Sequence, residues 1–350
     1  MPRRPIEKAP EAPLDKTRPT SGLTLIDVAK VAGVSPITVS RALNRPELVS
    51  DLTLEKVRRA VALVGYIPNM QAGGLASKQS KLVAVFVPTI AHSIFSDMVQ
   101  ALMDQLGEAG YQSILGVTGY SLEKEESLLG AILGRRPDGI VLMGTEHSAL
   151  TRQRLASSGI PVVETWDFCE DPIDILVGFS HEAVGKAVAG HLHDKGYRRF
   201  SVVSASDARG IKRCKGLVSE LSERGITEVP QVIFTPPATL KEGRAGLSQL
   251  FSAGSNPEVV VCSSDTVAQG VLAEAASRGL RVPEDLAVMG FGDMGSAAQL
   301  YPALSSVRLD GARVGGLIAK VLLERFRNQG DHQAPVRIDT GFTLIDRVSA

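Results

Sequence analysis

The chain has 350 residues, of which 44% are hydrophobic and 22% are charged. This length exceeds one compact core and predicts two or three domains of an ordinary globular protein. Three cysteines, far apart and in no CxxC spacing, favour a reducing cytoplasm over a disulfide framework or a zinc site. There is neither a signal-peptide pattern nor an apolar run of ~18 residues, so we expect no membrane partner.

The formal net charge is zero, but the charges are unevenly distributed. Residues 1–82 contain 13 Lys and Arg against 7 Asp and Glu, a balance of +6, which leaves the remainder acidic by the same amount. This asymmetry fits a basic nucleic-acid module joined to an acidic body. An ordinary solvated surface can produce it as well.

Residues 1–23 contain five prolines and mixed charge, which predicts a disordered extension. Residues 24–69 read as three short helices. Thr24 can cap the first helix, and the side chain of Asp27, three residues later, can accept a hydrogen bond from the Thr24 backbone N–H in return. We expect the inner face of this helix to hold Ile26, Ala29, Val31 and Ala32.

The second helix is predicted after a turn at Gly33, with Ser35 as its cap and Pro36 at its first position, where a missing N–H costs nothing. Two short helices joined by a glycine turn indicate either a DNA-reading helix-turn-helix or an ordinary helical hairpin. Ser50 begins the third helix and Gly65 ends it. Its predicted buried stripe consists of Leu54, Val57, Val61 and Val64.

Residues 70–81 are small and polar, which predicts a linker or a conditional hinge helix. Residues 82–350 then alternate apolar strand-like runs with amphipathic helical stretches. This pattern predicts an α/β core with parallel sheets covered on both faces, arranged as two lobes with a ligand crevice between them. We expect the chain to finish with Ser305–Asp310, a helix at Arg313–Arg327 and a strand at Val336–Leu344.

Several catalytic and metal patterns fail on inspection. Gly185-Lys186 lacks the remaining residues of a phosphate-binding loop, and His191 and His193, two apart on a helix, face different directions. Residues Gly290 to Gly295 match GxGxxG, but no complete dinucleotide-binding unit follows them. We therefore predict no cofactor and no metal, with this loop lying over the crevice instead.

Residue chemistry suggests crevice positions without fixing them. Arg213 offers a fork of donors to a ligand carboxylate, or begins a solvated basic helix. Trp166 can stack on a sugar face or fill the core. Ser264 and Asp293 follow strands and can bind hydroxyls or cap helices.

Short motifs through the head carry a specific pattern. They are Asp27-Val28-Ala29, Ala32-Gly33-Val34-Ser35, Thr38-Val39-Ser40-Arg41, Leu43-Asn44, Val49-Ser50 and Gly65-Tyr66-Ile67-Pro68-Asn69. Their order strongly resembles the head of the lactose-repressor (LacI/GalR) family. The resemblance continues from Leu82 to the end, through Asp138-Gly139-Ile140 and Gly279-Leu280-Arg281-Val282-Pro283 among others. Within the family, Val163-Glu164 and Gly341-Phe342-Thr343-Leu344 look most like the gluconate-utilisation repressors.

The resemblance implies a homodimeric transcriptional regulator that binds a near-palindromic operator in double-stranded DNA. Pro36 and Ile37 offer no side-chain hydrogen bonds at the reading positions, which leaves Arg41 as the expected guanine donor. Leu75 matches the leucine that wedges into the minor groove, although Gly73-Gly74 weakens that hinge helix by up to ~2 kcal/mol. The implied DNA-binding residues are Thr24, Ser35, Pro36, Ile37, Thr38, Ser40, Arg41, Asn44, Ser50, Thr53, Tyr66, Asn69 and Leu75.

Arg213 falls on the family's effector-binding arginine, and Phe95, Trp166 and Ser264 fall near other effector positions. The family's Gly-Tyr-Asp becomes Gly290-Phe291-Gly292, with Asp293 displaced by one, which fits a sugar-acid effector such as gluconate. Our leading hypothesis is a repressor controlled by this ligand. A two-lobed solute-binding protein without a DNA role and an NAD-dependent enzyme are the alternatives.

Overall fold

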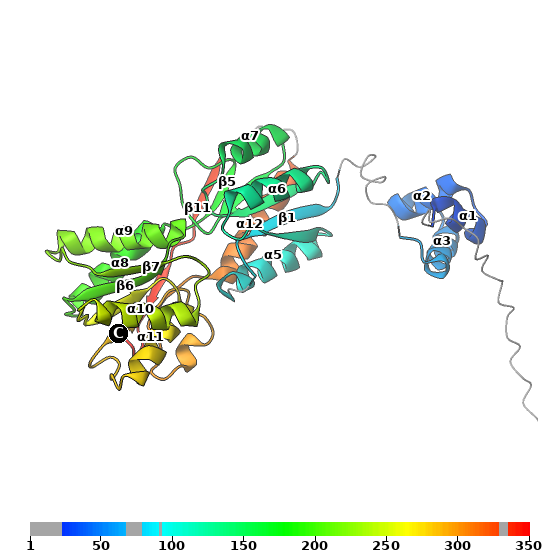
Figure 1. The fold of residues 1–350 in the computed structure, drawn as a ribbon. Helices are drawn as coiled ribbons and strands as arrows, with labels where there is room; N and C mark the ends of the chain where they lie inside the picture. Colours follow the sequence, from blue (N-terminus) through cyan, green and yellow to red (C-terminus); the bar gives the residue numbers. More distant parts are fainter. Residues whose placement is uncertain (1–22, 68–78, 91–92, 329–334) are drawn as a thin grey trace, which may run out of the picture. The chain divides into compact units, whose positions relative to one another are not determined.

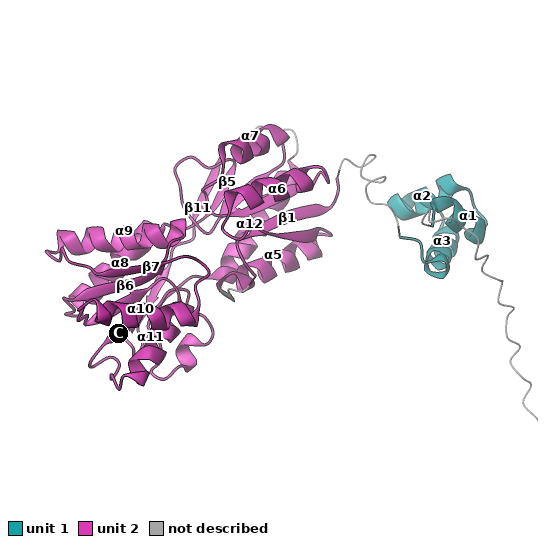
Figure 2. Cartoon of the chain, in the orientation of Figure 1, with its two compact units in different colours: residues 1–78 teal, residues 79–350 magenta. Residues whose placement is uncertain are grey.

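The structure is a computed structural model that describes residues 23–67, 79–90, 93–328 and 335–350. It contains two compact units, residues 1–78 and residues 79–350 (Figure 2). The predicted extension and the predicted hinge fall almost entirely outside the described residues. We describe the two units separately.

The first unit is a three-helix head. Its elements are α1 (Leu25–Ala32), α2 (Pro36–Asn44), the 3-10 turn η1 (Pro46–Leu48) and α3 (Asp51–Val64). The Asp27 carboxylate accepts hydrogen bonds from the Thr24 N–H at 3.0 Å and the Thr24 hydroxyl at 2.8 Å. The side chains of Ser35 and Ser50 cap α2 and α3, and the left-handed Gly33 ends α1. The predicted caps and turn are confirmed.

The head has a small apolar core centred on Val28, Val39 and Val57, each fully buried. Two residues predicted on the inner face of α1 are wrong, because Ile26 is 54% and Val31 50% exposed. The spacing that does face inward is Leu25, Val28, Ala29 and Ala32, the i, i+3, i+4, i+7 stripe of one helical face.

The second unit begins with a six-stranded parallel sheet, which forms the first lobe (Figure 1). Across the sheet its strands are β11 (Val336–Asp339), β5 (Ile175–Gly178), β4 (Val162–Thr165), β3 (Gly139–Met143), β1 (Leu82–Val87) and β2 (Gln112–Val117). Successive residues of β1 point to opposite faces: Val83 and Val85 join one buried cluster, whereas Ala84 and Phe86 join another.

Helices cover both faces of this sheet, as the near-continuous apolar strands predict. One face packs against α5 (Ser96–Glu108) and α12 (Gly311–Arg327), and the other against α6 (Leu122–Leu133) and α7 (Ala149–Ser158). The turn η2 (Ser93–Phe95) leads into α5 and brings Phe95 to the end of the sheet.

The second lobe has a four-stranded parallel sheet in the order β7-β6-β8-β9. Its strands are β6 (Phe200–Ala205), β7 (Gln231–Phe234), β8 (Val259–Cys262) and β9 (Ala287–Met289). Its faces are covered by α8 (His181–Asp194) with α9 (Ala208–Glu223), and by α10 (Leu240–Ser252) with α11 (Asp265–Ser277). The two-lobed α/β core with parallel sheets is confirmed.

Two glycines bring α8 and α9 into close contact. A Cβ on Gly185 would lie 2.1 Å from the Arg213 carbonyl oxygen, and one on Gly216 would lie 2.1 Å from that of Glu182. Only glycine fits at these two positions. The close approach holds the backbone of Arg213 against the start of α8.

The chain passes between the lobes three times: after β5, after β10 (Ser306–Arg308), and between β11 and β12 (Thr343–Ile345). The single strand predicted at Val336–Leu344 is therefore wrong. β11 joins the first sheet, whereas β12 pairs antiparallel with β10, and Gly341 at φ 65° turns the chain between them. An apolar run does not reveal that its two halves belong to different sheets.

Candidate DNA interface and ligand pocket

The start of α2 presents the predicted reading residues to solvent. Pro36 is exposed, Ile37 is 65% exposed, and Arg41 is exposed one turn further along the helix. This face combines two apolar side chains, which can contact thymine methyl groups, with a guanidinium that can reach a guanine edge.

Several of the other predicted DNA-contact residues also hold the head together. The Ser35 hydroxyl accepts from the Thr38 N–H at 3.2 Å, and the Ser50 hydroxyl accepts from the Thr53 N–H at 3.4 Å. The Asn44 amide donates to the Ser40 carbonyl oxygen at 3.0 Å. Each of these side chains fixes a helix turn in the absence of any ligand.

Tyr66 differs from the other predicted DNA contacts. It is 8% exposed and packs into the head core, so most of its ring serves that core. The predicted contacts Asn69 and Leu75, and the Gly73-Gly74 pair of the hinge, lie outside the described residues.

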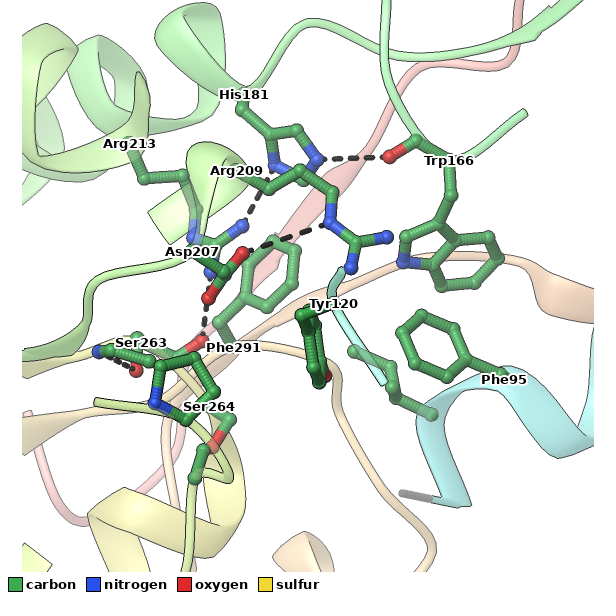
Figure 3. Close-up of a pocket in the computed structure, with 14 residues that line it drawn as sticks. Phe95, Tyr120, Trp166, His181, Asp207, Arg209, Arg213, Ser263, Ser264 and Phe291 are labelled. Carbon is green, nitrogen blue, oxygen red and sulfur yellow. Dashed lines mark hydrogen bonds and ion pairs between the residues drawn. The ribbon is translucent and has the colours of Figure 1, made fainter. Parts of the chain in front are cut away.

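A pocket of about 50 Å³ lies in the crevice of the second unit. Figure 3 shows side chains converging on it from both lobes. Its lining consists of Ile94, Phe95, Tyr120, Trp166, His181, Ala205, Asp207, Arg209, Arg213, Pro236, Ala238, Ser263, Ser264 and Phe291. Four of the five predicted effector residues are among them: Phe95, Trp166, Arg213 and Ser264.

Aromatic rings form one wall of the pocket. Trp166 is 2% exposed and meets Phe95 edge to face, with ring centroids 5.4 Å apart, and Phe179 at 5.9 Å. Its backbone is left-handed at φ 63°, a conformation that is rare for a bulky residue and marks a constrained position. Trp166 thus belongs to the core and also lines the pocket, and its stacking on a sugar stays a prediction.

Arg213 and His181 form a fixed pair beside this wall. An Nη of Arg213 donates to His181 Nδ1 at 2.8 Å, so the His181 proton sits on Nε2, which donates to the Trp166 carbonyl oxygen at 3.0 Å. Burial and the charge of Arg213 hold the pKa of His181 well below its usual range, and His181 is neutral at pH 7. The other Nη of Arg213 donates to the Ser263 carbonyl oxygen at 3.0 Å.

The Arg213 side chain is partly buried. Desolvation lowers its pKa to about 10, which still leaves it charged at pH 7. Its guanidinium carbon lies 4.0 Å from the centre of the Phe291 ring, a cation–π contact. Phe291 comes from the glycine-rich loop after β9, which therefore lies at the crevice as predicted.

Asp207 and Arg209 were missed by sequence reasoning, although both lie near Arg213 in the chain. Asp207 caps α9 and lies 3.7 Å from Arg209 Nε. Arg209 is 8% exposed and lines the pocket one turn before Arg213. The i, i+4 spacing of two arginines after a capping Asp was the available signal.

Asp293 does not line the pocket, in contrast to our prediction. Its carboxylate pairs with Arg308 Nε and with an Nη of Arg347, each at 2.6 Å. Burial alone raises its pKa, but these two arginines lower it below its usual value. Ser264 lines the pocket but also caps α11, accepting from the Val267 N–H at 3.3 Å.

A second buried charge cluster lies in the first lobe, away from the pocket. His147, whose side chain is fully buried, lies 2.7 Å from Glu125 and 3.4 Å from Glu164. Burial by itself lowers the pKa of His147, but the two carboxylates raise it more, to about 9. Among the described residues no group of His, Cys, Asp and Glu has a geometry that holds a metal ion, and no helix could span a membrane.

Comparison with known proteins assigns the chain to a class. Residues 24–69 match the bacterial regulatory proteins of the lacI family, and residues 189–350 match the periplasmic binding protein-like domain. The HTH-type transcriptional regulator GntR of Pseudomonas aeruginosa is 36% identical over 95% of this chain and 97% of its own length. The chain belongs to the LacI family of DNA-binding transcriptional regulators, and these are not enzymes.

Solved structures agree with this assignment. A LacI-family transcriptional regulator from Silicibacter pomeroyi superposes with a TM-score of 0.88 at 30% identity, covering 94% of this chain and 99% of that one. The lac repressor dimer bound to operator and the anti-inducer ONPF has a TM-score of 0.81 at 24% identity, covering 94% and 99%. At that identity it supports the fold alone.

Proposed function

We propose that this regulator is a repressor of sugar-acid catabolism genes, that it binds a near-palindromic operator as a homodimer, and that a gluconate-type sugar acid controls it. The relatives named GntR support the ligand class. The match of residues 24–69 to the lacI family supports DNA binding. A regulator of this kind acts in the cytoplasm, where the chromosome lies.

The observation that carries the ligand class is the charge of the pocket. Arg209 and Arg213 contribute two positive charges, Asp207 contributes one negative charge, and His181 is neutral. The lining therefore has a net charge of +1 in a partly enclosed site. Such a site favours a ligand with one negative charge over a neutral sugar, because Asp207 can balance only one of the two guanidinium charges.

The rest of the lining suits a polyol chain. The rings of Trp166, Phe95 and Tyr120 offer apolar faces to C–H groups, whereas the hydroxyl of Ser264 and the Asp207 carboxylate are within the same lining to meet hydroxyl groups. An alternation of apolar faces and polar groups is the arrangement that a hydroxylated carbon chain requires.

The pocket lies between two lobes that are joined by three chain segments, so a ligand bound there contacts both lobes. The effector then changes DNA affinity only as far as it binds one lobe arrangement better than the other.

The DNA-reading role is tested with Arg41→Ala. We expect the variant to lose about 1–3 kcal/mol of discrimination between the operator and a one-base variant of it. The measurement is a competition binding assay at fixed salt, with Arg59→Ala, an exposed arginine paired with Glu55, as the control. Unchanged operator preference in Arg41→Ala would refute the proposed reading role.

The effector role is tested by thermal shift with gluconate, 2-ketogluconate and phosphorylated gluconate, followed by calorimetry. Arg213→Ala is expected to abolish the response while sparing operator binding. If calorimetry shows the same gluconate affinity for Arg213→Ala and the wild type, Arg213 has no role in effector binding. If no sugar acid raises the melting temperature of the wild type, the ligand class itself is wrong.

A further inference from the structure

Among the described residues that line the pocket, Arg209 carries a guanidinium nitrogen, Nη1, that makes no hydrogen bond. It extends from the first turn of α9 between Tyr120 and Trp166 (Figure 3). Its guanidinium carbon lies 5.5 Å from the Phe95 ring centre and 5.8 Å from that of Tyr120. Its Nε faces Asp207 at 3.7 Å, an ion-pair distance too long for a hydrogen bond.

The Nη1 atom of Arg209 is buried and has no acceptor within the part of the chain that the structure describes. Leaving a buried charged donor unpaired is costly, so native proteins seldom do so without a reason. Arg209 lines the crevice pocket, so a ligand that enters there is placed to supply an acceptor to its guanidinium. The preferred acceptor for a guanidinium is a carboxylate.

Arg213 is in the opposite condition. One Nη donates to His181 and the other to the Ser263 carbonyl oxygen, and its face is covered by Phe291. Three protein groups therefore fix its position before any ligand enters. Our sequence prediction gave the ligand carboxylate to Arg213, but the contacts leave Arg209 as the donor that needs it.

We propose that Arg209 is the specificity-determining residue that receives the carboxylate of the ligand, whereas the fixed Arg213 orients the hydroxyl chain. The proposal rests on the proposed sugar-acid function and narrows it. With a net lining charge of +1, the ligand carries a single carboxylate, and a phosphorylated sugar acid would leave excess negative charge in the partly enclosed site.

The test compares D-gluconate with D-glucitol, its neutral counterpart in which a CH₂OH group replaces the carboxylate, by calorimetry on the full chain. We expect the wild type to bind gluconate at least about 30-fold more tightly than glucitol, as a charge-assisted contact in a partly enclosed site allows. In Arg209→Gln the preference should fall to within about threefold, through loss of gluconate affinity at unchanged glucitol affinity.

Lys212→Gln is the matched control. Lys212 lies on the same helix and carries the same charge, but it pairs with Asp167 at 2.6 Å and does not line the pocket. Its removal should leave the preference for gluconate unchanged. An equal loss in Lys212→Gln would mean that helix charge, and not contact with Arg209, selects the acid, and would overturn the proposal.

Stability without ligand separates a binding role from a structural one. Because Nη1 of Arg209 lacks an acceptor, Arg209→Gln should melt no lower than the wild type, whereas removal of a structural arginine lowers the melting temperature. Arg209→Lys, which keeps the charge and loses the planar fork, should keep part of the preference and serves as the second variant if Arg209→Gln does not fold.

The outcomes are distinguishable. A wild type that binds gluconate with a preference unchanged in Arg209→Gln overturns the role of Arg209 and leaves the proposed function standing. Tighter binding of 6-phosphogluconate than of gluconate overturns the single-carboxylate ligand. A wild type that binds no sugar acid overturns both the proposed function and this inference.

Discussion

The head and the crevice pocket are built in different ways. Every residue of the head core comes from one stretch of about forty residues. Two of its helices are capped by a serine that bonds to a backbone N–H only three residues further along the chain. The pocket instead collects side chains from segments between Ile94 and Phe291. A site made of local contacts can be identified in the sequence, whereas a site assembled from distant segments depends on how the whole chain packs.

The largest effect should come from adding one methyl group where α8 meets α9. Gly216→Ala places a Cβ 2.1 Å from the Glu182 carbonyl oxygen, and we expect a loss of about 3 kcal/mol as the helices are forced apart. Gly33→Ala in the head meets no neighbouring atom, and only its left-handed backbone at φ 66° opposes it, at about 1 kcal/mol. Chemical denaturation of each variant measures both.

Gly107→Ala is the control for this comparison. Gly107 lies in α5 with nothing near its missing Cβ, so the variant should gain about 0.5–1 kcal/mol from better helix propensity. If Gly216→Ala is no less stable than Gly107→Ala, the close approach of α8 and α9 is not a constraint.

A pH-dependent effect, at its upper limit about as large as that of Gly216→Ala, is expected from the buried cluster of the first lobe. The folded-state pKa of His147, about 9, lies above its ordinary 6.5, so its stabilisation is complete below about pH 6.5 and is lost as the pH rises through 9. At 1.36 kcal/mol per pKa unit the upper limit is about 3 kcal/mol.

The measurement is the unfolding free energy of the wild type and of His147→Gln between pH 6 and 10. The difference between the two proteins should be largest near pH 6 and should shrink above pH 9. A difference that stays constant over this range would show that His147 is not held as a cation by Glu125 and Glu164.

A variant of Asp293 distinguishes a structural role of this residue from a role in ligand binding. Asp293→Asn should lower stability by about 2 kcal/mol, because charge-assisted bonds to Arg308 and Arg347 become neutral ones. Its effector affinity should stay within about threefold of the wild type, equivalent to under 1 kcal/mol. A stable variant that no longer binds the effector would restore the role that the sequence suggested.

The smallest effect concerns the head alone. Ser35→Ala removes the side-chain cap of α2 and should cost about 1 kcal/mol of head stability, leaving effector binding unchanged. Thermal melting measures the stability of the head, and separate titrations with operator and with effector measure the two affinities. A loss of effector affinity in this variant would contradict the local construction of the head.

Much of the fold could be predicted because its signals are local. Ser35 and Ser50 stand where helix caps are required, and apolar strands alternating with amphipathic helices indicate covered parallel sheets. The same local reasoning failed for Ile26 and Val31, since apolar character alone does not say which face of a short helix is covered. The family pattern pointed to Phe95, Trp166, Arg213 and Ser264, all of which line the pocket.

The sequence by itself determined the helical head, the two-lobed α/β core and the family, because helix and strand periodicities and motif order are properties of neighbouring residues. Only the tertiary structure decided what each pocket side chain contacts. In the tertiary structure the two halves of Val336–Leu344 belong to different sheets, and Asp293 pairs with two arginines. His181 is neutral because it is buried beside Arg213. Within the described residues, Nη1 of Arg209 is also left without an acceptor. These outcomes depend on burial and on partners far away along the chain, which no local pattern records.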